Sequence, residues 1–167
     1  LGIHRVEARE LLLKHRAAFP RFWEWTNQVV ETAAWKRHMQ TRLGWSLYLG
    51  STDLLNGKRI KDRTLVNFPI QGTGGDLLRL ASIMAMDAGL DVGAPVHDAL
   101  LLCAPLYEIE DQARELEQVM ARASMEILGG VALRSETSIT AFPDRYEPEK
   151  GQELWDSTLQ MLEEVKK

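Results

Sequence analysis

Residues 94–105 read APVHDALLLCAP, in which the polar pair His97-Asp98 separates two short apolar runs. Apolar runs of this length around a two-residue polar break predict a β-hairpin over residues 92–104, buried on at least one face. The polar pair then forms the turn at the tip of the hairpin. Because an aspartate side chain readily accepts hydrogen bonds from nearby backbone N–H groups in turns, the pair by itself implies no function.

Helical patterns surround this hairpin. Helices are predicted over residues 3–18, 21–40, 64–89, 106–128 and 149–166. Pro69 is expected to kink or restart the third of them. TRLGWSLYL (residues 41–49) predicts a short strand or hairpin, and ETSITAF (residues 136–142) alternates like a strand. This order predicts an α+β fold, with a small antiparallel sheet covered by helices on one side.

The composition is that of one compact domain. The chain has 167 residues, of which 45% are hydrophobic, and a formal net charge of −4, which argues against nucleic-acid binding through overall positive charge but leaves local basic patches open. The single cysteine, Cys103, excludes an internal disulfide framework and a cysteine-based zinc site, and its apolar neighbours predict a buried side chain. One unpaired cysteine, no membrane-spanning apolar run and no signal-peptide pattern predict a cytoplasmic protein without membrane contact.

A second motif, RTLVNFPIQGTGGD (residues 63–76), precedes the hairpin. Arg63, Asn67 and Gln71 recur every four residues, which in a helix places a cation and two amides on one stripe. Their donors suit the minor groove of DNA, where the acceptors A N3 and T O2 occupy similar places in every base pair. Such a stripe would sense base pairing without reading sequence. The alternative is an exposed polar face, with Asn67 as a helix N-cap.

Three glycines follow the stripe, at positions 72, 74 and 75. Without side chains there, another part of the backbone or a ligand can approach the helix closely. The alternative is that the glycines mark a loop. A phosphate-binding loop is excluded because no Lys-Ser/Thr pair follows them.

In this order the motifs resemble the C-terminal part of family A DNA polymerases, the DNA polymerase I class. NFPIQGTGGD (residues 67–76) is similar to the family pattern N-x-P-x-Q-G-T-A-x-D, which opens a long fingers helix, and VHDAL (residues 96–100) is similar to the H-D-E hairpin tip called motif C. Residues 1–25 resemble the helices that follow the nucleotide-binding helix, and TRLGWSLYL resembles the T-x-x-G-R-R-x-Y-L segment. The resemblance runs from near residue 1 to about residue 142, and the tail resembles phage- or mobile-element-type members.

The resemblance implies a role for each matched residue. Asp98 takes the place of the metal-binding motif C aspartate, and His97 that of a histidine near the primer terminus. Arg63, Asn67 and Gln71 take the places of residues that contact the minor groove and the template. The implied cofactor is Mg²⁺, two ions held with a second aspartate from outside this chain, and the implied partners are primer-template DNA and dNTP. Independently, a carboxylate at a hairpin tip is held rigidly, and Mg²⁺ prefers such oxygen ligands together with substrate phosphates.

Three departures bear on activity. Ala99 replaces the glutamate of H-D-E, and Trp45-Ser46 replaces the Arg-Arg pair, which removes two phosphate contacts. Neither motif A, D-Y-S-x-I-E, nor the nucleotide-binding helix occurs in these residues. The basic stretch GKRIKDR (residues 57–63), with Lys58, Arg59, Lys61 and Arg63, either replaces the lost phosphate contacts or forms a solvated loop.

One carboxylate cannot arrange two Mg²⁺ ions and a triphosphate, so the chain alone is expected not to polymerise DNA. The first residue is Leu1 rather than Met, which also suggests a fragment. Without a strand bearing motif A, the hairpin would leave an edge and an apolar face exposed. We therefore expect the chain to bind a missing N-terminal polymerase segment, in cis or in trans, or to self-associate.

Two regions are expected. Residues 1–90 would form partial fingers helices and a connecting hairpin, ending in the primer-template contacting helix, and residues 91–167 would form the C-terminal palm part. The predicted function is the C-terminal part of a template-directed DNA polymerase, which adds deoxynucleotides to a primer 3′ end by a two-metal mechanism. The alternatives are a non-catalytic duplex-DNA-binding module or split-polymerase subunit, and an α+β interaction domain in which His97 and Asp98 only make a turn.

Overall fold

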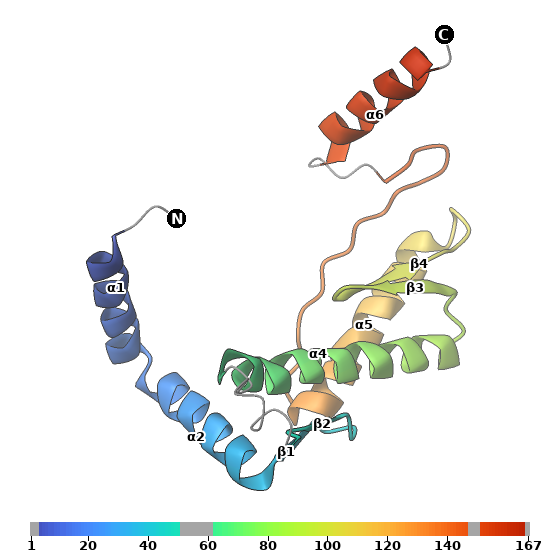
Figure 1. Cartoon of the computed structure of the whole chain (residues 1–167). Coiled ribbons are helices and arrows are strands. Elements are labelled where there is room, and N and C mark those ends of the chain that lie inside the picture. Colours follow the sequence, from blue (N-terminus) through green and yellow to red (C-terminus); the bar gives the residue numbers. More distant parts are fainter. Residues whose placement is uncertain (1–3, 51–61, 147–150, 166–167) are drawn as a thin grey trace.

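The computed structural model describes residues 4–50, 62–146 and 151–165. Within these ranges the chain forms five α-helices and two antiparallel sheets of two strands each (Figure 1). The predicted α+β class is confirmed. The single sheet that the strand pattern suggested is replaced by two separate hairpins, because the strands of one hairpin do not pair with those of the other.

The first two helices are α1 (Arg5–Ala18) and α2 (Pro20–Lys36), with Pro20 in the first turn of α2, where its missing N–H breaks no helical hydrogen bond. The predicted extension of the second helix to residue 40 is wrong. Arg37 takes a left-handed conformation with φ of 56°, and its N–H donates to the carbonyl of Ala33, which ends the helix. The next residues form β1 (His38–Gln40), which pairs with β2 (Ser46–Tyr48) as the predicted hairpin.

Helix α4 (Asp62–Asp87) has 26 residues and continues through Pro69. The predicted restart of the helix at Pro69 is wrong. Proline removes only one backbone donor from the helix, and Leu65 and Gly72, which are buried on either side of it, hold both flanking turns by packing. The whole RTLVNFPIQGTGGD motif therefore lies on one helix.

The predicted hairpin consists of β3 (Val92–Val96) and β4 (Ala99–Leu102). It packs against α4 and shares a hydrophobic core with α4 and α5 (Ile109–Leu128). Its core contains Ala85, Leu90, Leu116 and Val119, with the partly buried Met84, Val92, Leu100, Leu102 and Met120 against them. One face of the hairpin thus packs against the core, as predicted, although its side chains are only partly buried. The other face is open: Leu101 is 54% exposed, and Cys103 is exposed too, so its predicted burial is wrong. The alternation of a strand places Cys103 on that open face.

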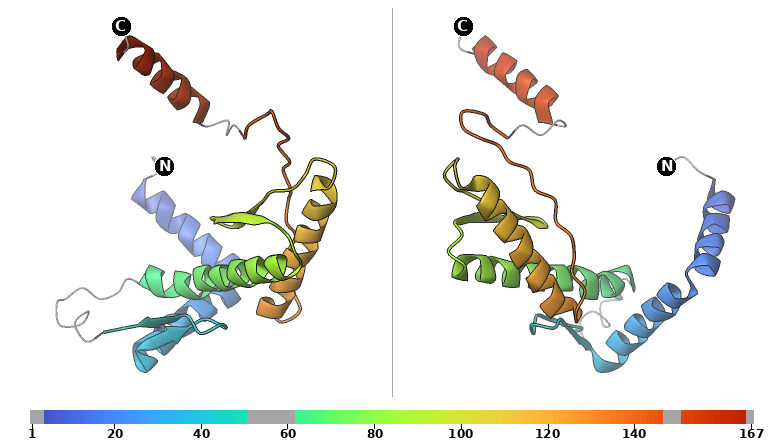
Figure 2. Two further views of the ribbon diagram at one scale, coloured as in Figure 1. Left: turned by 90° about the vertical axis from the view of Figure 1, so that its right-hand side faces the viewer. Right: turned by 180° about the vertical axis from the view of Figure 1, so that it is seen from behind.

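After α5 the chain runs back along that helix without forming a strand (Figure 1). The strand predicted over residues 136–142 is wrong, because a strand needs a pairing partner and no described segment pairs with it. Side-chain hydrogen bonds hold the segment instead: the N–H of Leu133 donates to Oγ of Ser124 at 2.8 Å, and the hydroxyl of Thr137 donates to the carboxylate of Glu117. The last helix, α6 (Gln152–Val165), stands apart from the others (Figure 2).

None of the helices in the described ranges has the length and apolar character needed to cross a membrane.

Candidate nucleic-acid interface

The predicted stripe lies on the first half of α4. Arg63, Asn67 and Gln71 are all exposed, and none of their side chains makes a hydrogen bond or ion pair with another described residue. Their spacing on one continuous helix puts them in a single row. The cation and the two amides are therefore available together to an external partner. Lys58, Arg59 and Lys61 of the basic stretch lie outside the described residues.

Arg63 and Asn67 face the side of α4 that packs, further along the helix, against α5 and the β3–β4 hairpin. Arg63 and Ala81 are separated by roughly five turns of an α-helix, as are Asn67 and Ala85, so each pair points in about the same direction. Ala81 and Ala85 are both 0% exposed, and Ala85 packs in the core with residues of α5 and the hairpin. The hairpin runs back along α4, and its turn lies over the middle of that helix in every view (Figure 1 and Figure 2).

The turn itself consists of His97 and Asp98, because Val96 pairs with Ala99. His97 has φ of 55°, a positive value that two-residue hairpin turns require at their first central residue. For a residue with a Cβ this conformation costs about 1 kcal/mol. Both side chains are exposed, and neither makes a hydrogen bond or ion pair with a described residue. The carboxylate of Asp98 therefore sits at the tip of a rigid hairpin, free to bind an external ligand.

The described residues form no metal site by themselves. No group of three or more His, Cys, Asp or Glu side chains in the described ranges could hold a metal ion. Asp98 fits one position around Mg²⁺, an ion that usually keeps several waters and binds substrate phosphates besides one or two carboxylates. Two ions need at least one more carboxylate than this turn provides.

The β1–β2 turn packs against α4 beside the stripe. A Cβ on Gly72 would lie 2.5 Å from Cγ2 of Thr41, and a Cβ on Gly75 would lie 3.3 Å from Cζ3 of Trp45. A close approach was predicted for backbone or a ligand; at these two glycines it is made instead by side chains of the β1–β2 turn. A Cβ on Gly74 would meet no other atom within 4 Å, so this position leaves open space on the helix.

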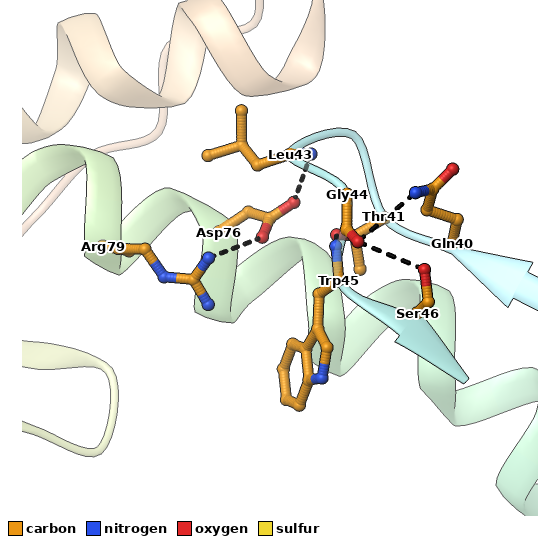
Figure 3. Close-up of polar contacts among 8 residues, drawn as sticks. All are labelled: Gln40, Thr41, Leu43, Gly44, Trp45, Ser46, Asp76 and Arg79. Atoms are coloured by element: carbon orange, nitrogen blue, oxygen red, sulfur yellow. Dashed lines mark hydrogen bonds and ion pairs between the residues drawn. The ribbon is translucent and has the colours of Figure 1, made fainter. Parts of the chain in front are cut away.

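Asp76 is the residue of this region whose role the motif alone did not reveal. It is 0% exposed, and its Oδ2 accepts a hydrogen bond of 2.8 Å from the backbone N–H of Leu43 (Figure 3). Its Oδ1 has no hydrogen-bond partner among the described residues and lies 3.9 Å from the half-exposed guanidinium of Arg79, a weak contact. A sequence signal existed: Asp76 follows Gly72 by four residues, so both lie on the same buried face.

The same turn also contacts α5. The guanidinium of Arg42 donates a hydrogen bond of 3.3 Å to the carbonyl of Ile127, in the last turn of α5, whose carbonyls lack helical partners. Asp76 and Arg42 thus tie residues 41–45 to two helices at once. This turn thus adds two polar contacts to the direct packing of α4 on α5.

The comparisons with known proteins agree with this arrangement. Residues 1–141 match the family described as DNA polymerase family A. DNA polymerase I of Geobacillus stearothermophilus is 32% identical over 131 residues, which cover 74% of this chain and 15% of that protein. The thermostable DNA polymerase I of Thermus aquaticus is 28% identical over 126 residues, covering 72% of this chain and 15% of that protein.

Among solved structures, the POL domain of Pol1 from M. smegmatis in complex with DNA primer-template and dNTP has a TM-score of 0.61 and 26% identity, and the match covers 74% of this chain and 23% of that one. The chain belongs to DNA polymerase family A, which confirms the resemblance and its extent along the sequence. It spans about 15% of the length of each of these two DNA polymerase I relatives.

Proposed function

We propose that the chain forms the C-terminal palm part and part of the fingers of a template-directed DNA polymerase, which adds deoxynucleotides to a primer 3′ end. One observation carries the proposal: Arg63 and Asn67 of the stripe face the side of α4 that packs, further along the helix, against the hairpin with the His97-Asp98 turn. In this assignment residues 1–90 are the fingers part and residues 91–167 the palm part. The partners are primer-template DNA, dNTP and an N-terminal polymerase segment, supplied in cis or in trans.

The stripe binds the duplex end of the primer-template. The amides of Asn67 and Gln71 and the guanidinium of Arg63 donate hydrogen bonds to acceptors in the minor groove, whose positions are shared by all correct base pairs. A mismatch displaces those acceptors and leaves donors unpaired. The stripe therefore senses correct pairing, with little preference for sequence.

The hairpin turn serves the primer terminus. His97 lies beside the terminal nucleotide, and Asp98 supplies one carboxylate ligand to Mg²⁺, with the second aspartate coming from the N-terminal segment. When bound, the two ions stabilise the charge that develops as the primer 3′-hydroxyl attacks and the leaving group departs. The chain alone is inactive in this proposal, because its turn offers a single carboxylate.

Duplex binding by the 167-residue chain tests the stripe. Fluorescence anisotropy at low salt should show that Arg63→Ala weakens binding to duplexes of different sequence alike. Asn67→Ala should also weaken binding, whereas Asn27→Ala, at an exposed asparagine on α2, should not. Absence of binding at low salt would refute the stripe as a DNA surface.

The lone carboxylate of the turn favours a second function, a duplex-DNA-binding module or split-polymerase subunit without its own chemistry. Primer extension with Mg²⁺, measured after adding a separate family A segment that carries motif A, distinguishes the two functions. Catalysis is supported if Asp98→Ala reduces extension at least about 100-fold. The control Asp91→Ala, at an exposed aspartate, should leave extension unchanged. Duplex binding without any extension supports the binding module.

A further inference from the structure

The row of polar residues on α4 does not end at Gln71. Continuing the same four-residue spacing leads to Gly75, which has no side chain. The indole of Trp45, which comes from the β1–β2 turn, lies over this position, with Cζ3 3.3 Å from the place of a Cβ on Gly75. A ring from another segment thus occupies the next place in the row.

This indole is fixed in position and yet accessible. The backbone of Trp45 makes two hydrogen bonds with Thr41: its N–H donates to the Thr41 hydroxyl at 3.1 Å, and its carbonyl accepts from the Thr41 N–H at 2.8 Å. Its ring meets the ring of Phe68 edge to face, with centroids 6.1 Å apart. The residue is nevertheless 51% exposed, and its side chain points away from the hydrogen bonds of the turn (Figure 3).

We propose that Trp45 is a stacking platform for one unpaired nucleobase at the junction between duplex and single strand, at the end of the stripe. The inference rests on the proposed function and deepens it. An indole anchored through a hydrogen-bonded turn, in a residue that is about half exposed, suits the face of a base, and such stacking tolerates any base. Inside a duplex both faces of a base are covered by its neighbours, so an unpaired base beyond the last pair is the one free to stack.

The replacement of the family Arg-Arg pair by Trp45-Ser46 also favours contact with a base over contact with phosphates at this place. Two cations would bind phosphates in a salt-dependent manner, whereas an indole binds a base face largely independently of salt. The unpaired base belongs either to a template overhang or to a frayed primer end. Both sources present the same chemistry.

Three DNA substrates with the same duplex distinguish the sources: one blunt, one with a 5′ overhang and one with a 3′ overhang, each overhang carrying 2-aminopurine as its first unpaired base. The 167-residue chain should bind one overhanging duplex more tightly than the blunt one and quench its 2-aminopurine. Trp45→Ala should weaken binding to that substrate about tenfold and abolish quenching, while binding to the blunt duplex changes less than about twofold. Trp45→Phe should retain most of both effects.

Trp35→Ala is the matched control, since Trp35 is 82% exposed on α2, and it should change nothing. Quenching of the 5′ overhang identifies the template as the source, and quenching of the 3′ overhang identifies the primer. Equal losses on all three substrates, or no loss, in Trp45→Ala would overturn the inference. If Arg63→Ala still weakens blunt-duplex binding in that case, the proposed function stands without this platform.

Discussion

The buried carboxylate of Asp76 accepts a hydrogen bond from the backbone N–H of Leu43, with 2.8 Å between the two heavy atoms. The bond joins the middle of α4 to a turn 33 positions earlier in the sequence. Through Arg42, that turn also contacts the carbonyl end of α5. The β1–β2 turn is therefore anchored both to the helix that carries the stripe and to the helix that shares its core with the β3–β4 hairpin.

Asp76→Ala should lower the free energy of unfolding by about 1–3 kcal/mol, because it leaves the partly buried N–H of Leu43 without a partner. Asp76→Asn should cost less, since an amide oxygen can still accept that bond. Denaturant unfolding monitored by circular dichroism measures both. Asp91→Ala, at an exposed position, serves as the control and should leave the midpoint unchanged. An unchanged midpoint in Asp76→Ala would show that the bond to Leu43 contributes nothing.

Alanine substitutions at two glycines within one turn of α4, Gly72 and Gly74, should act in opposite directions. Gly72→Ala places a methyl group 2.5 Å from Cγ2 of Thr41, so it should destabilise the fold by about 1–3 kcal/mol. Gly74→Ala places its methyl group in open space and should stabilise the helix by about 0.5–1 kcal/mol, because alanine loses less conformational freedom than glycine. Denaturant midpoints give the sign of each change.

A second substitution tests the cause of the Gly72 effect. Thr41→Ser removes the clashing methyl group and keeps the hydroxyl that accepts the hydrogen bond from the N–H of Trp45. In the Gly72→Ala background it should restore part of the lost stability. If the two substitutions add independently, the clash with Thr41 is not the reason for the loss.

The strain at His97 predicts a gain in stability from glycine. His97→Gly should stabilise the hairpin by roughly 0.5–1 kcal/mol, because glycine adopts a positive φ without a steric penalty. His97→Ala keeps a Cβ and should give no such gain. Thermal unfolding of the three proteins separates backbone strain from loss of the imidazole. Equal stability of the glycine and alanine variants would contradict strain at this φ of 55°.

The sequence predicted the features that depend on local pattern. The β3–β4 hairpin, its turn and the exposed row of Arg63, Asn67 and Gln71 follow from periodicity over a few residues, and the structure has all of them. The strand over residues 136–142 failed because alternation predicts a strand only where a partner strand is present. Within that segment, Thr137 contacts α5 instead.

The roles of Asp76 and Trp45 depend on tertiary contact, which no local pattern encodes. Asp76 reads as one more polar residue in a helix until the turn at Leu43 is placed against it. Trp45 reads as a strand residue until Gly75 is seen beneath its ring. Glycines 72 and 75 indicate that something packs closely on α4, because glycine in a helix interior permits close approach, but they do not say which segment it is.

The exchange of Arg-Arg for Trp45-Ser46 predicts a measurable change in salt dependence. Trp45→Arg places a guanidinium at the end of the stripe, where it can neutralise one phosphate and release its counterion. In a plot of log affinity for duplex DNA against log salt concentration, the slope of this variant should be steeper by about 0.9. Its affinity at low salt should also rise. Trp45→Gln is the matched control, because it removes the indole without adding charge and should leave the slope unchanged.

The variant with arginine should also lose the preference for an overhanging duplex, since it replaces the base contact by a phosphate contact. Identical slopes in the two variants would mean that the end of the stripe does not reach the DNA backbone.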